Sequence, residues 1–391
     1  MSIKIALLLG AGIFALILLC GCTQTSPAPV GQQQTTETPS VTMTVPFGPI
    51  PVESTNGVNI AYELEFSGME IMTFVPETVE VLDADTGNLL YSPNASVLSK
   101  TAFPASVPPP TEAELQNGTG KLPQPRISIW FVVSPGTVPD RLTNRVTFNR
   151  TAEGLAPLTV TSENITVRKD LAPIVVGSPV KGTGWAIMET TSPVVHHVTS
   201  QITMANVTRV PQRYAQDFIL INTTTGTAFA GNMSIARDYY GFGQNLYAVG
   251  NGTVVYVRDG VPDIEITTQK PPVTVDSALG NGVVIDLGDN KYACYGHMVN
   301  GSVRVKVGDS VTEGQVIGLM GNTGNSDAPH LHFQVITDNP TVLGGEGYPI
   351  VYRSFTVTGR FDEENITGIF FNESLPQENR LMENDVIVTF P

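Results

Sequence analysis

Short runs of alternating apolar and polar residues, separated by turn residues, dominate the chain from residue 48 onward. Because successive side chains of a strand point to opposite faces, this pattern predicts β-strands. Only TEAELQNG (111–118) favours a helix. We therefore expect a β-sandwich-like domain over residues 48–172. Its predicted strands are VNIAYELEF (58–66), VEVLDA (79–84), ISIWFVV (127–133), RVTFN (145–149) and LTVTSENITV (158–167).

The β pattern continues from residue 173 to 391 with more glycine and no helical periodicity. Segment 307–324 alternates short apolar stretches with glycine turns, and the acidic region from about 361 resembles a loop that ends in a final strand, DVIVTF. We expect a second domain over 173–391 and an all-β fold class, with a Gly-rich antiparallel sheet or barrel-like arrangement. Its clearest strands are GTVVYV (252–257), NGVVIDLG (281–288) and KYACYGHM (291–298).

The first 22 residues have the pattern of an export signal. Lys4 precedes an apolar stretch over 5–19, and the segment Leu19-Cys20-Gly21-Cys22 resembles the end of a lipoprotein signal peptide. We expect lipid on Cys22 and anchoring to the outer face of the cytoplasmic membrane; an uncleaved anchor helix is the alternative. Residues 23–47, rich in Thr, Gln, Pro and Ser, are predicted to be a disordered linker.

Composition narrows the function classes. The net charge of −15 repels phosphate backbones, so nucleic acid is not an expected partner. If Cys20 and Cys22 belong to the signal, Cys294 is alone, no intramolecular disulfide forms, and Cys294 is a small core residue. The oligomeric state stays open, with a monomer preferred. Eleven Asn-x-Ser/Thr sequons favour an exported surface protein: Asn94, Asn117, Asn149, Asn164, Asn206, Asn222, Asn232, Asn251, Asn300, Asn365 and Asn372.

All five histidines lie in the C-terminal half, and residues 48–172 contain neither His nor Cys. We therefore interpret that first domain as a spacer or docking module and place the chemistry in the second. His330 and His332 flank Leu331, so in a strand both imidazoles lie on one face. Imidazole is the commonest zinc ligand, and a second imidazole nearby can handle a proton. The remaining histidines are His196, His197 and His297.

The motifs around these histidines resemble the lysostaphin/LytM-type zinc metallopeptidases. They are Tyr295-Gly296-His297-Met298, Val307-Gly308-Asp309, Gly314-Gln315-Val316-Ile317-Gly318, Gly321-Asn322-Thr323-Gly324 and His330-Leu331-His332-Phe333. The resemblance spans at least residues 245–335. It implies that His332 binds zinc, that His330 acts on the attacking water or the developing oxyanion, and that His297 is its catalytic partner.

The rest of the implied ligand set departs from the family. Its usual H-x-x-x-D motif corresponds to Arg213 and Asp217, so the carboxylate is present but arginine, which does not deprotonate, replaces the histidine. Either His197 or His196 supplies the third ligand, with His197 preferred, or the site is degenerate. Strand alternation predicts that Arg213 shares the face of Asp217 and pairs with it or contacts substrate.

The resemblance implies a zinc-dependent endopeptidase that cuts peptide bonds of a cell-wall or surface glycopeptide through a zinc-activated water. The alternative is a catalytically degenerate binding or activator protein of the cell envelope. The presence of His297, His330 and His332 favours the enzyme. Biotinyl, lipoyl and phosphotransfer carrier domains also resemble this Gly-rich fold, but they need a modified lysine or a single phosphorylated histidine instead. The polymer and the bond cleaved are not predicted.

Overall fold

The computed structural model describes residues 40–69, 74–103, 106–107, 124–151, 155–204, 207–266 and 274–391. Strands make up nearly all of its regular structure, which confirms the all-β fold class. The helix predicted at 111–118 and the signal sequence lie outside the described residues. Within the described part, no helix has both the length and the hydropathy needed to cross a membrane.

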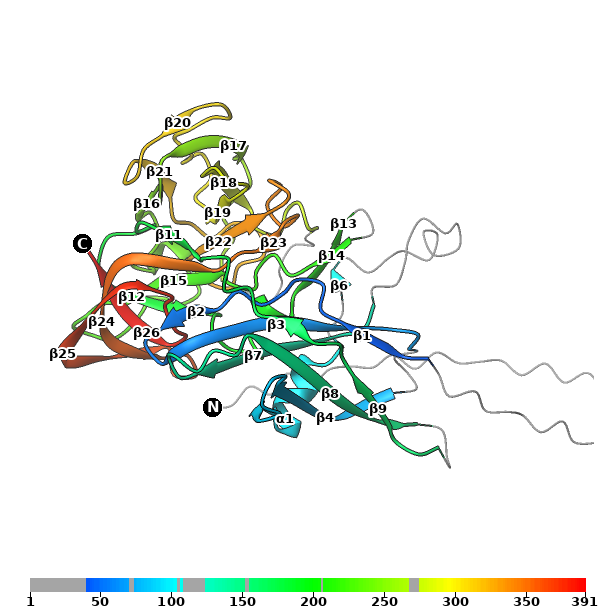
Figure 1. Ribbon diagram of the computed structural model, residues 1–391. Coiled ribbons are helices and arrows are strands. Elements are labelled where there is room, and N and C mark those ends of the chain that lie inside the picture. The colour runs from blue at the N-terminus through cyan, green and yellow to red at the C-terminus, as the bar shows by residue number, and fades with distance from the viewer. Residues whose placement is uncertain are drawn as a thin grey trace, which may run out of the picture. The chain divides into compact units, whose positions relative to one another are not determined.

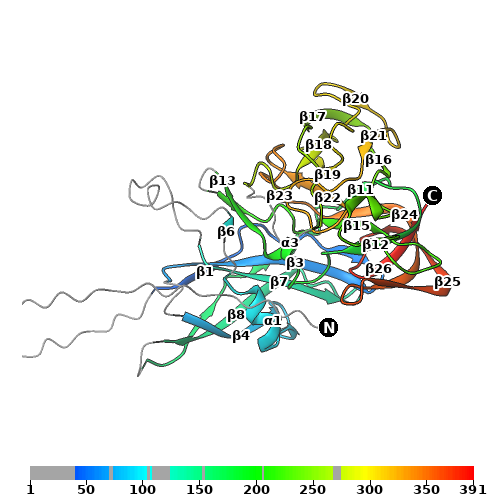
Figure 2. The same cartoon turned by 180° about the vertical axis from the view of Figure 1, so that it is seen from behind.

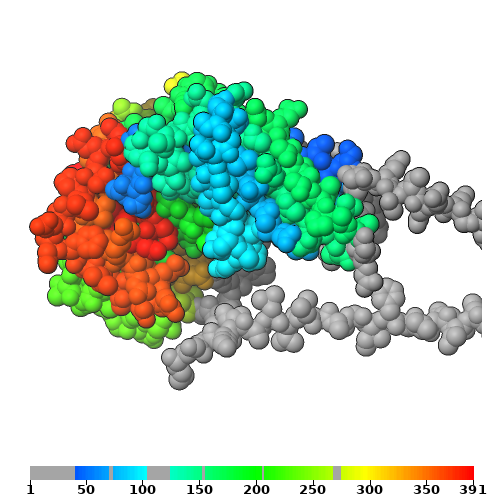
Figure 3. Space-filling model, turned by 60° about the horizontal axis from the view of Figure 1, so that its bottom comes forward, coloured from blue at the N-terminus to red at the C-terminus, as the bar shows by residue number. Residues whose placement is uncertain are grey.

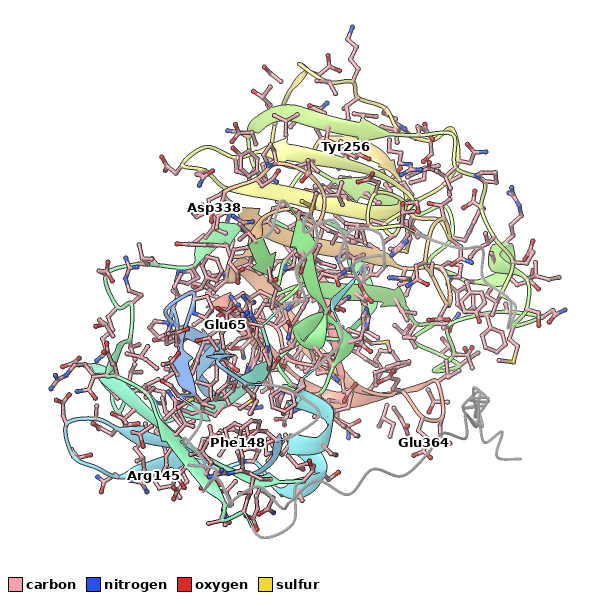
Figure 4. The ribbon with its side chains drawn as sticks, turned by 90° about the vertical axis from the view of Figure 1, so that its right-hand side faces the viewer. Glu65, Arg145, Phe148, Tyr256, Asp338 and Glu364 are labelled. Carbon is pink, nitrogen blue, oxygen red and sulfur yellow. The ribbon has the colours of Figure 1, made fainter. Side chains whose placement is uncertain are left out.

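Two sheets form the N-terminal sandwich (Figure 1). One contains β1 (Thr42–Thr44), β2 (Val52–Ser54), β3 (Gly57–Ser67) and β7 (Arg126–Val133). The other contains β4 (Phe74–Asp83), β5 (Leu89–Tyr91), β8 (Arg141–Arg150), β9 (Leu158–Thr161) and β10 (Ile165–Thr166). The alternating apolar residues of both sheets meet in one core that includes Tyr62, Val81 and Phe148, the last labelled in Figure 4. This is the sandwich that the alternation predicted.

The helix α1 (Ala95–Thr101) was not predicted from the sequence. It is too short for a helical period to stand out, and its N-cap is Asn94, whose side chain accepts a hydrogen bond from the amide of Val97 at 3.0 Å. Such a cap is a local signal that alternation does not show.

A twelve-stranded sheet carries most of the C-terminal half. Its strands are antiparallel apart from the parallel pair β11–β24. Figure 1 shows β22, β19, β18 and β17 following one another away from β15. In spatial order the strands are β11 (Ile174–Val176), β24 (Ile350–Asp362), β26 (Val386–Phe390), β12 (Gly182–Met188), β15 (Gln216–Leu220), β22 (Leu331–Thr337), β19 (Tyr292–Met298), β18 (Asn281–Asp286), β17 (Gly252–Arg258) and β20 (Ser310–Val311), with β23 (Glu346–Gly347) on β22 and β25 (Thr367–Arg380) on β24.

The prediction of a loop from residue 361 onward is wrong. β24 continues to Asp362, residues 363–366, which begin with Glu363 and Glu364, form a tight turn, and β25 runs back antiparallel along β24. β25 is mostly exposed, so it needs no apolar face, and its polar sequence concealed it. The segment after β25 lies against the N-terminal sandwich, as Figure 3 shows, where Glu383 accepts hydrogen bonds from the backbone amide and side chain of Asn56.

Short elements connect these sheets. They are α3 (His196–Thr199), the 3-10 helix η2 (Ala236–Asp238), a sheet of β6 (Ser106–Val107), β13 (Gln201–Met204) and β14 (Val207–Arg209), and the pair β16 (Asn245–Tyr247) and β21 (Val316–Leu319).

The main core lies on the central strands of the large sheet, where Trp185, Phe218 and Leu331 are almost fully buried. Ala61 on β3 and Trp130 on β7 belong to the same cluster. The sandwich and the large sheet therefore share apolar packing. The boundary near residue 172 stays a prediction.

Candidate metal and active site

Strand pairing places the first two predicted ligands side by side. Asp217 on β15 lies directly opposite His332 on β22, so both side chains project from the same face of the sheet. The two strands are held there because Phe218 and Leu331, the next residue pair in register, are fully buried on the other face. His332 Nδ1 lies 3.0 Å from Asp217 Oδ1.

The short helix α3 brings His197 to the same point. His197 Nε2 lies 3.6 Å from Asp217 Oδ2, and its ring centre is 4.7 Å from that of His332. One ligand atom from each of the three residues lies within 4.8 Å of the others. The neighbouring His196 is largely exposed and contacts Glu189 Oε2 at 2.9 Å. Of the two histidines that the sequence left open, the structure therefore brings His197 into the group.

The hydrogen bonds behind the two imidazoles fix which nitrogen faces the group. His197 donates from Nδ1 to the carbonyl of Glu189 at 2.8 Å. His332 donates from Nε2 to Gln334 Oε1 at 2.9 Å, and the amide orientation of Gln334 is set by its donation to the Val342 carbonyl at 3.0 Å. The lone pairs of His197 Nε2 and His332 Nδ1 are thus left pointing toward the Asp217 carboxylate.

This arrangement fits a metal cation. Two imidazole lone pairs and a carboxylate are all acceptors, and acceptors that converge without a donor are unfavourable unless a proton or a cation lies between them. Two nitrogens and one oxygen with outward-facing hydrogen bonds are also the donor set of a three-ligand zinc site, which leaves a fourth position for water. The residues present therefore fit zinc.

His297 and His330 lie beside this group. His330 Nε2 is 3.5 Å from Asp217 Oδ2, and the ring centres of His297 and His330 are 4.5 Å apart. Each ring donates from Nδ1 to a backbone carbonyl: His330 to Ala328 at 2.7 Å and His297 to Thr323 at 2.6 Å. Nε2 of each ring is therefore the nitrogen available to a substrate.

His297 also has a strained backbone. Its φ of 61° lies in the left-handed region, which is uncommon for residues other than glycine. It is the last residue but one of β19, and its amide and carbonyl are both held, by the carbonyl of Leu279 and the amide of Gly321. Strain that the surroundings enforce in this way is typical of functional sites.

Burial and the neighbouring charges set the protonation of the site. Burial, assisted by the adjacent imidazoles, holds the pKa of His197 and of His297 well below the usual histidine value, although Asp217 opposes the shift. Burial would raise the pKa of Asp217, but the surrounding histidines, His197 first, hold it well below its usual value. At neutral pH the site therefore contains an ionised carboxylate and neutral imidazoles at His197 and His297, the forms that bind metal and accept protons.

All five histidines line one cleft of about 550 Å³. Its polar lining includes the carboxylates of Glu189, Asp327 and Glu363, and an apolar part contains Ile202, Leu279 and Leu343. Within the described ranges, neither Lys nor Arg lines this cleft.

The predicted position of Arg213 is wrong. β15 begins at Gln216, so Arg213 lies in the preceding turn and does not share the strand face of Asp217. Its guanidinium pairs with Glu63 and Glu346, and it does not line the cleft. A turn breaks the two-residue alternation on which the prediction rested.

Sequence reasoning also missed Gln334 and the Glu189 carbonyl, which orient the two imidazoles. Gln334 follows His332 by two residues on the same strand, so alternation alone would have placed it on the face of His332. The Glu189 carbonyl gives no signal in the sequence. Cys294 is fully buried and unpaired, as the sequence predicted.

Part of the chain is similar to known proteins. Residues 236–343 match the model described as peptidase family M23. The chain is 35% identical over 111 residues to endolysin 2638A of Staphylococcus phage 2638A, covering 27% of this chain and 20% of that protein. It is 40% identical over 91 residues to the peptidoglycan DD-endopeptidase ShyA of Vibrio cholerae, covering 23% and 19%. It is 40% identical over 103 residues to lysostaphin of Staphylococcus staphylolyticus, covering 24% and 21%.

The chain thus matches about a fifth of the length of these relatives. Among solved structures, the catalytic domain of the prophage-encoded M23 protein EnpA from Enterococcus faecalis is similar at 25% identity and a TM-score of 0.23, over 35% of this chain and 75% of that one. The catalytic domain of lysostaphin from Staphylococcus simulans is similar at 25% identity and a TM-score of 0.22, over 34% and 74%. The family match includes His297, His330 and His332, whereas His197 and Asp217 precede it.

Proposed function

We propose that this chain, which contains a peptidase family M23 domain as its motifs predicted, is a zinc-dependent endopeptidase acting on the peptide part of a cell-wall or surface glycopeptide. The observation that carries the proposal is the convergence of His197, Asp217 and His332 within 4.8 Å, with His297 and His330 beside them in one cleft. The similarity to the peptidoglycan DD-endopeptidase ShyA supports the substrate class.

His197 Nε2, an Asp217 carboxylate oxygen and His332 Nδ1 would hold the ion. Zinc bound there would lower the pKa of its water toward neutrality and polarise the scissile carbonyl. His330 Nε2 accepts the proton of the attacking water, or stabilises the developing oxyanion once protonated, and His297 acts as its partner across the 4.5 Å ring separation. The low pKa of His297 keeps its Nε2 unprotonated and able to accept a proton at neutral pH.

The charge of the cleft favours one class of peptide substrate. Three carboxylates, on Glu189, Asp327 and Glu363, line the cleft that contains the metal group, and neither Lys nor Arg is among its described lining residues. A peptide that carries a free amine near the scissile bond is therefore favoured over one rich in carboxylates. Acetylation of that amine should raise KM, and an unchanged or lower KM would contradict this preference.

The domain arrangement completes the proposal. Residues 1–22 act as a signal that leaves lipid on Cys22 at the outer face of the cytoplasmic membrane, 48–172 are a β-sandwich-like domain, and 173–391 carry the peptidase site. The linker predicted over 23–47 is wrong at its C-terminal end, because β1 (Thr42–Thr44) pairs with β3 and its Met43 is buried in the sandwich core. This arrangement holds the cleft outside the cell, next to an envelope substrate.

The alternative is a degenerate binding or activator protein. Its basis was arginine in place of the family's histidine at position 213. His197, lying 3.6 Å from Asp217, offers a replacement ligand and favours the enzyme.

Metal content and turnover test the proposal together. The full chain loaded with zinc should contain about one ion per chain and cleave peptide-linked murein or a plain peptide. His332→Ala should lose the ion, and His330→Ala should keep it and lose about 10²–10⁴-fold in turnover. His196→Ala, which changes an exposed neighbour of the site, is the matched control and should retain the metal. Wild-type chain without zinc after loading would reject the metalloenzyme, and a zinc-loaded chain inactive on every peptide would favour the binding protein.

A further inference from the structure

Arg213 lies between two buried carboxylates. Its Nε donates to Glu63 Oε1 at 3.1 Å, its Nη2 also contacts Glu63 Oε2, and Nη2 lies 2.5 Å from Glu346 Oε1. The three side chains are each 5% exposed or less. Burial, together with the nearby charge of Glu63, raises the pKa of Glu346 to about 7 against the opposing effect of Arg213. Arg213 is the described residue that forms ion pairs with both carboxylates, while Arg126 acts on Glu346 only through its charge.

The cluster joins three segments of the chain. Glu63 is on β3 of the N-terminal sandwich, and Arg213 lies four residues before Asp217. Glu346 is on β23, where it pairs in register with Thr337 of β22, the strand that carries His332. Glu346 also accepts a hydrogen bond from the amide of Val210 at 3.3 Å. The ion pairs thus link the sandwich to the turn before β15 and to the neighbour of β22.

The same sheet of the sandwich also supports the element that carries His197. Figure 2 shows α3 beside β3 and β7, and the Ser128 hydroxyl donates to the Val198 carbonyl at 3.4 Å. Trp130 on β7 packs on Tyr214, the residue after Arg213, with ring centres 5.5 Å apart. Because α3 has only four residues and no side-chain hydrogen bond at its N-cap, its position depends on this packing.

We propose that the N-terminal sandwich is a structural part of the metal centre and that Arg213 is its positioning residue. Paired with Glu63 and Glu346, Arg213 fixes the turn before β15, so that Asp217 meets the His197 that α3 presents. At position 213, where the family has a metal ligand, this chain has an arginine that anchors the turn before β15. This extends the spacer role predicted for residues 48–172, and it rests on the proposed zinc site.

The test compares two substitutions on one strand of the full chain. Glu63→Gln keeps the shape of the side chain and removes its charge. Glu65→Gln makes the same change two residues further along β3, where the carboxylate pairs with Arg126 at 2.6 Å; Arg126 reaches the Thr208 carbonyl but not the metal group. Figure 4 labels Glu65 on the side of the sandwich that faces the large sheet. Zinc affinity is measured by competition with a chromophoric chelator, and the visible spectrum of the cobalt-substituted chain reports ligand geometry.

Glu63→Gln should weaken zinc binding about 10–100-fold, as changes behind the ligands do, and alter the cobalt spectrum. Glu65→Gln should leave both unchanged. Arg213→Lys should recover part of the loss seen in Arg213→Met. If Arg213→Met does not fold, three variants still show whether the cluster affects zinc binding: Glu63→Gln, Glu65→Gln and Arg213→Lys.

Two results would overturn the inference and are distinguishable. If Glu63→Gln unfolds more easily but binds zinc and cobalt as the wild type does, the cluster is purely structural and only this inference fails. If the wild-type chain itself binds no zinc, the proposed function fails, and this inference with it.

Discussion

Gln334 offers a sharp test of how the site holds its metal. Its side chain is fully buried, its Oε1 accepts from His332 Nε2 at 2.9 Å, and its Nε2 donates to the Val342 carbonyl at 3.0 Å. Gln334→Met keeps roughly the same length and flexibility but removes both functions. His332 would then lose the acceptor that keeps its proton on Nε2 and its lone pair on Nδ1.

Gln334→Met should reduce both zinc affinity and the stability of the metal-free chain, and the two effects are measured separately. Zinc affinity should fall about 10–100-fold, or about 1.4–2.8 kcal/mol, because the ligand loses its orienting partner. The metal-free chain should lose about 1–3 kcal/mol of unfolding free energy because the buried His332 N–H is left without a partner, in addition to the lost hydrogen bond to the partly buried Val342 carbonyl.

Gln216→Met is the matched control. Gln216 is equally buried on the adjacent strand, and its amide donates to the Met382 carbonyl at 3.0 Å without touching an imidazole. The Gln216→Met variant should lose about as much unfolding free energy as Gln334→Met but bind zinc as tightly as the wild type. Chelator competition and urea unfolding of the metal-free chains measure the two quantities. Equal zinc affinity in Gln334→Met and wild type would refute the assignment of Nδ1 as the metal-binding nitrogen of His332.

Three further predictions concern protonation, packing and anchoring. Because the pKa of His297 is well below 6.5 in the folded chain, the unfolded chain binds more protons, so this residue's contribution to stability is full above about pH 6.5 and is lost as pH falls. Urea unfolding should show that His297→Asn loses less unfolding free energy between pH 7.5 and 5.5 than the wild type does. The raised pKa of Glu346 changes stability in the opposite direction, but it does so equally in both proteins and therefore does not affect the comparison. Leu331→Ala should cost about 2–5 kcal/mol of unfolding free energy, since Leu331 is fully buried behind the two histidines, and a cost below about 1 kcal/mol would contradict that packing. Cys22→Ser should move the protein out of the membrane fraction, whereas unchanged fractionation would favour the uncleaved anchor helix.

The sequence by itself determined the fold class and half of the site. Alternation of apolar residues identifies strands because the side-chain period is a local property of the chain. His330-Leu331-His332 and the turn at His297 belong to short motifs, so their types and spacing were visible without the fold. The edge strand β25 was not predicted, because an exposed strand needs no apolar face. The helix α1 was not predicted, because seven residues are too few to show a helical period.

Only the tertiary structure decided which side chains meet. The register of β15 against β22 places Asp217 opposite His332 across 115 residues of chain, and the packing of α3 on the sandwich selects His197 over His196. Arg213 shows most clearly what the sequence pattern could not predict. Its spacing from Asp217 predicted a common strand face, but its partners Glu63 and Glu346 lie 150 residues before it and on another strand after it. Such long-range pairs depend on how the sheets pack, which no local pattern of residues records.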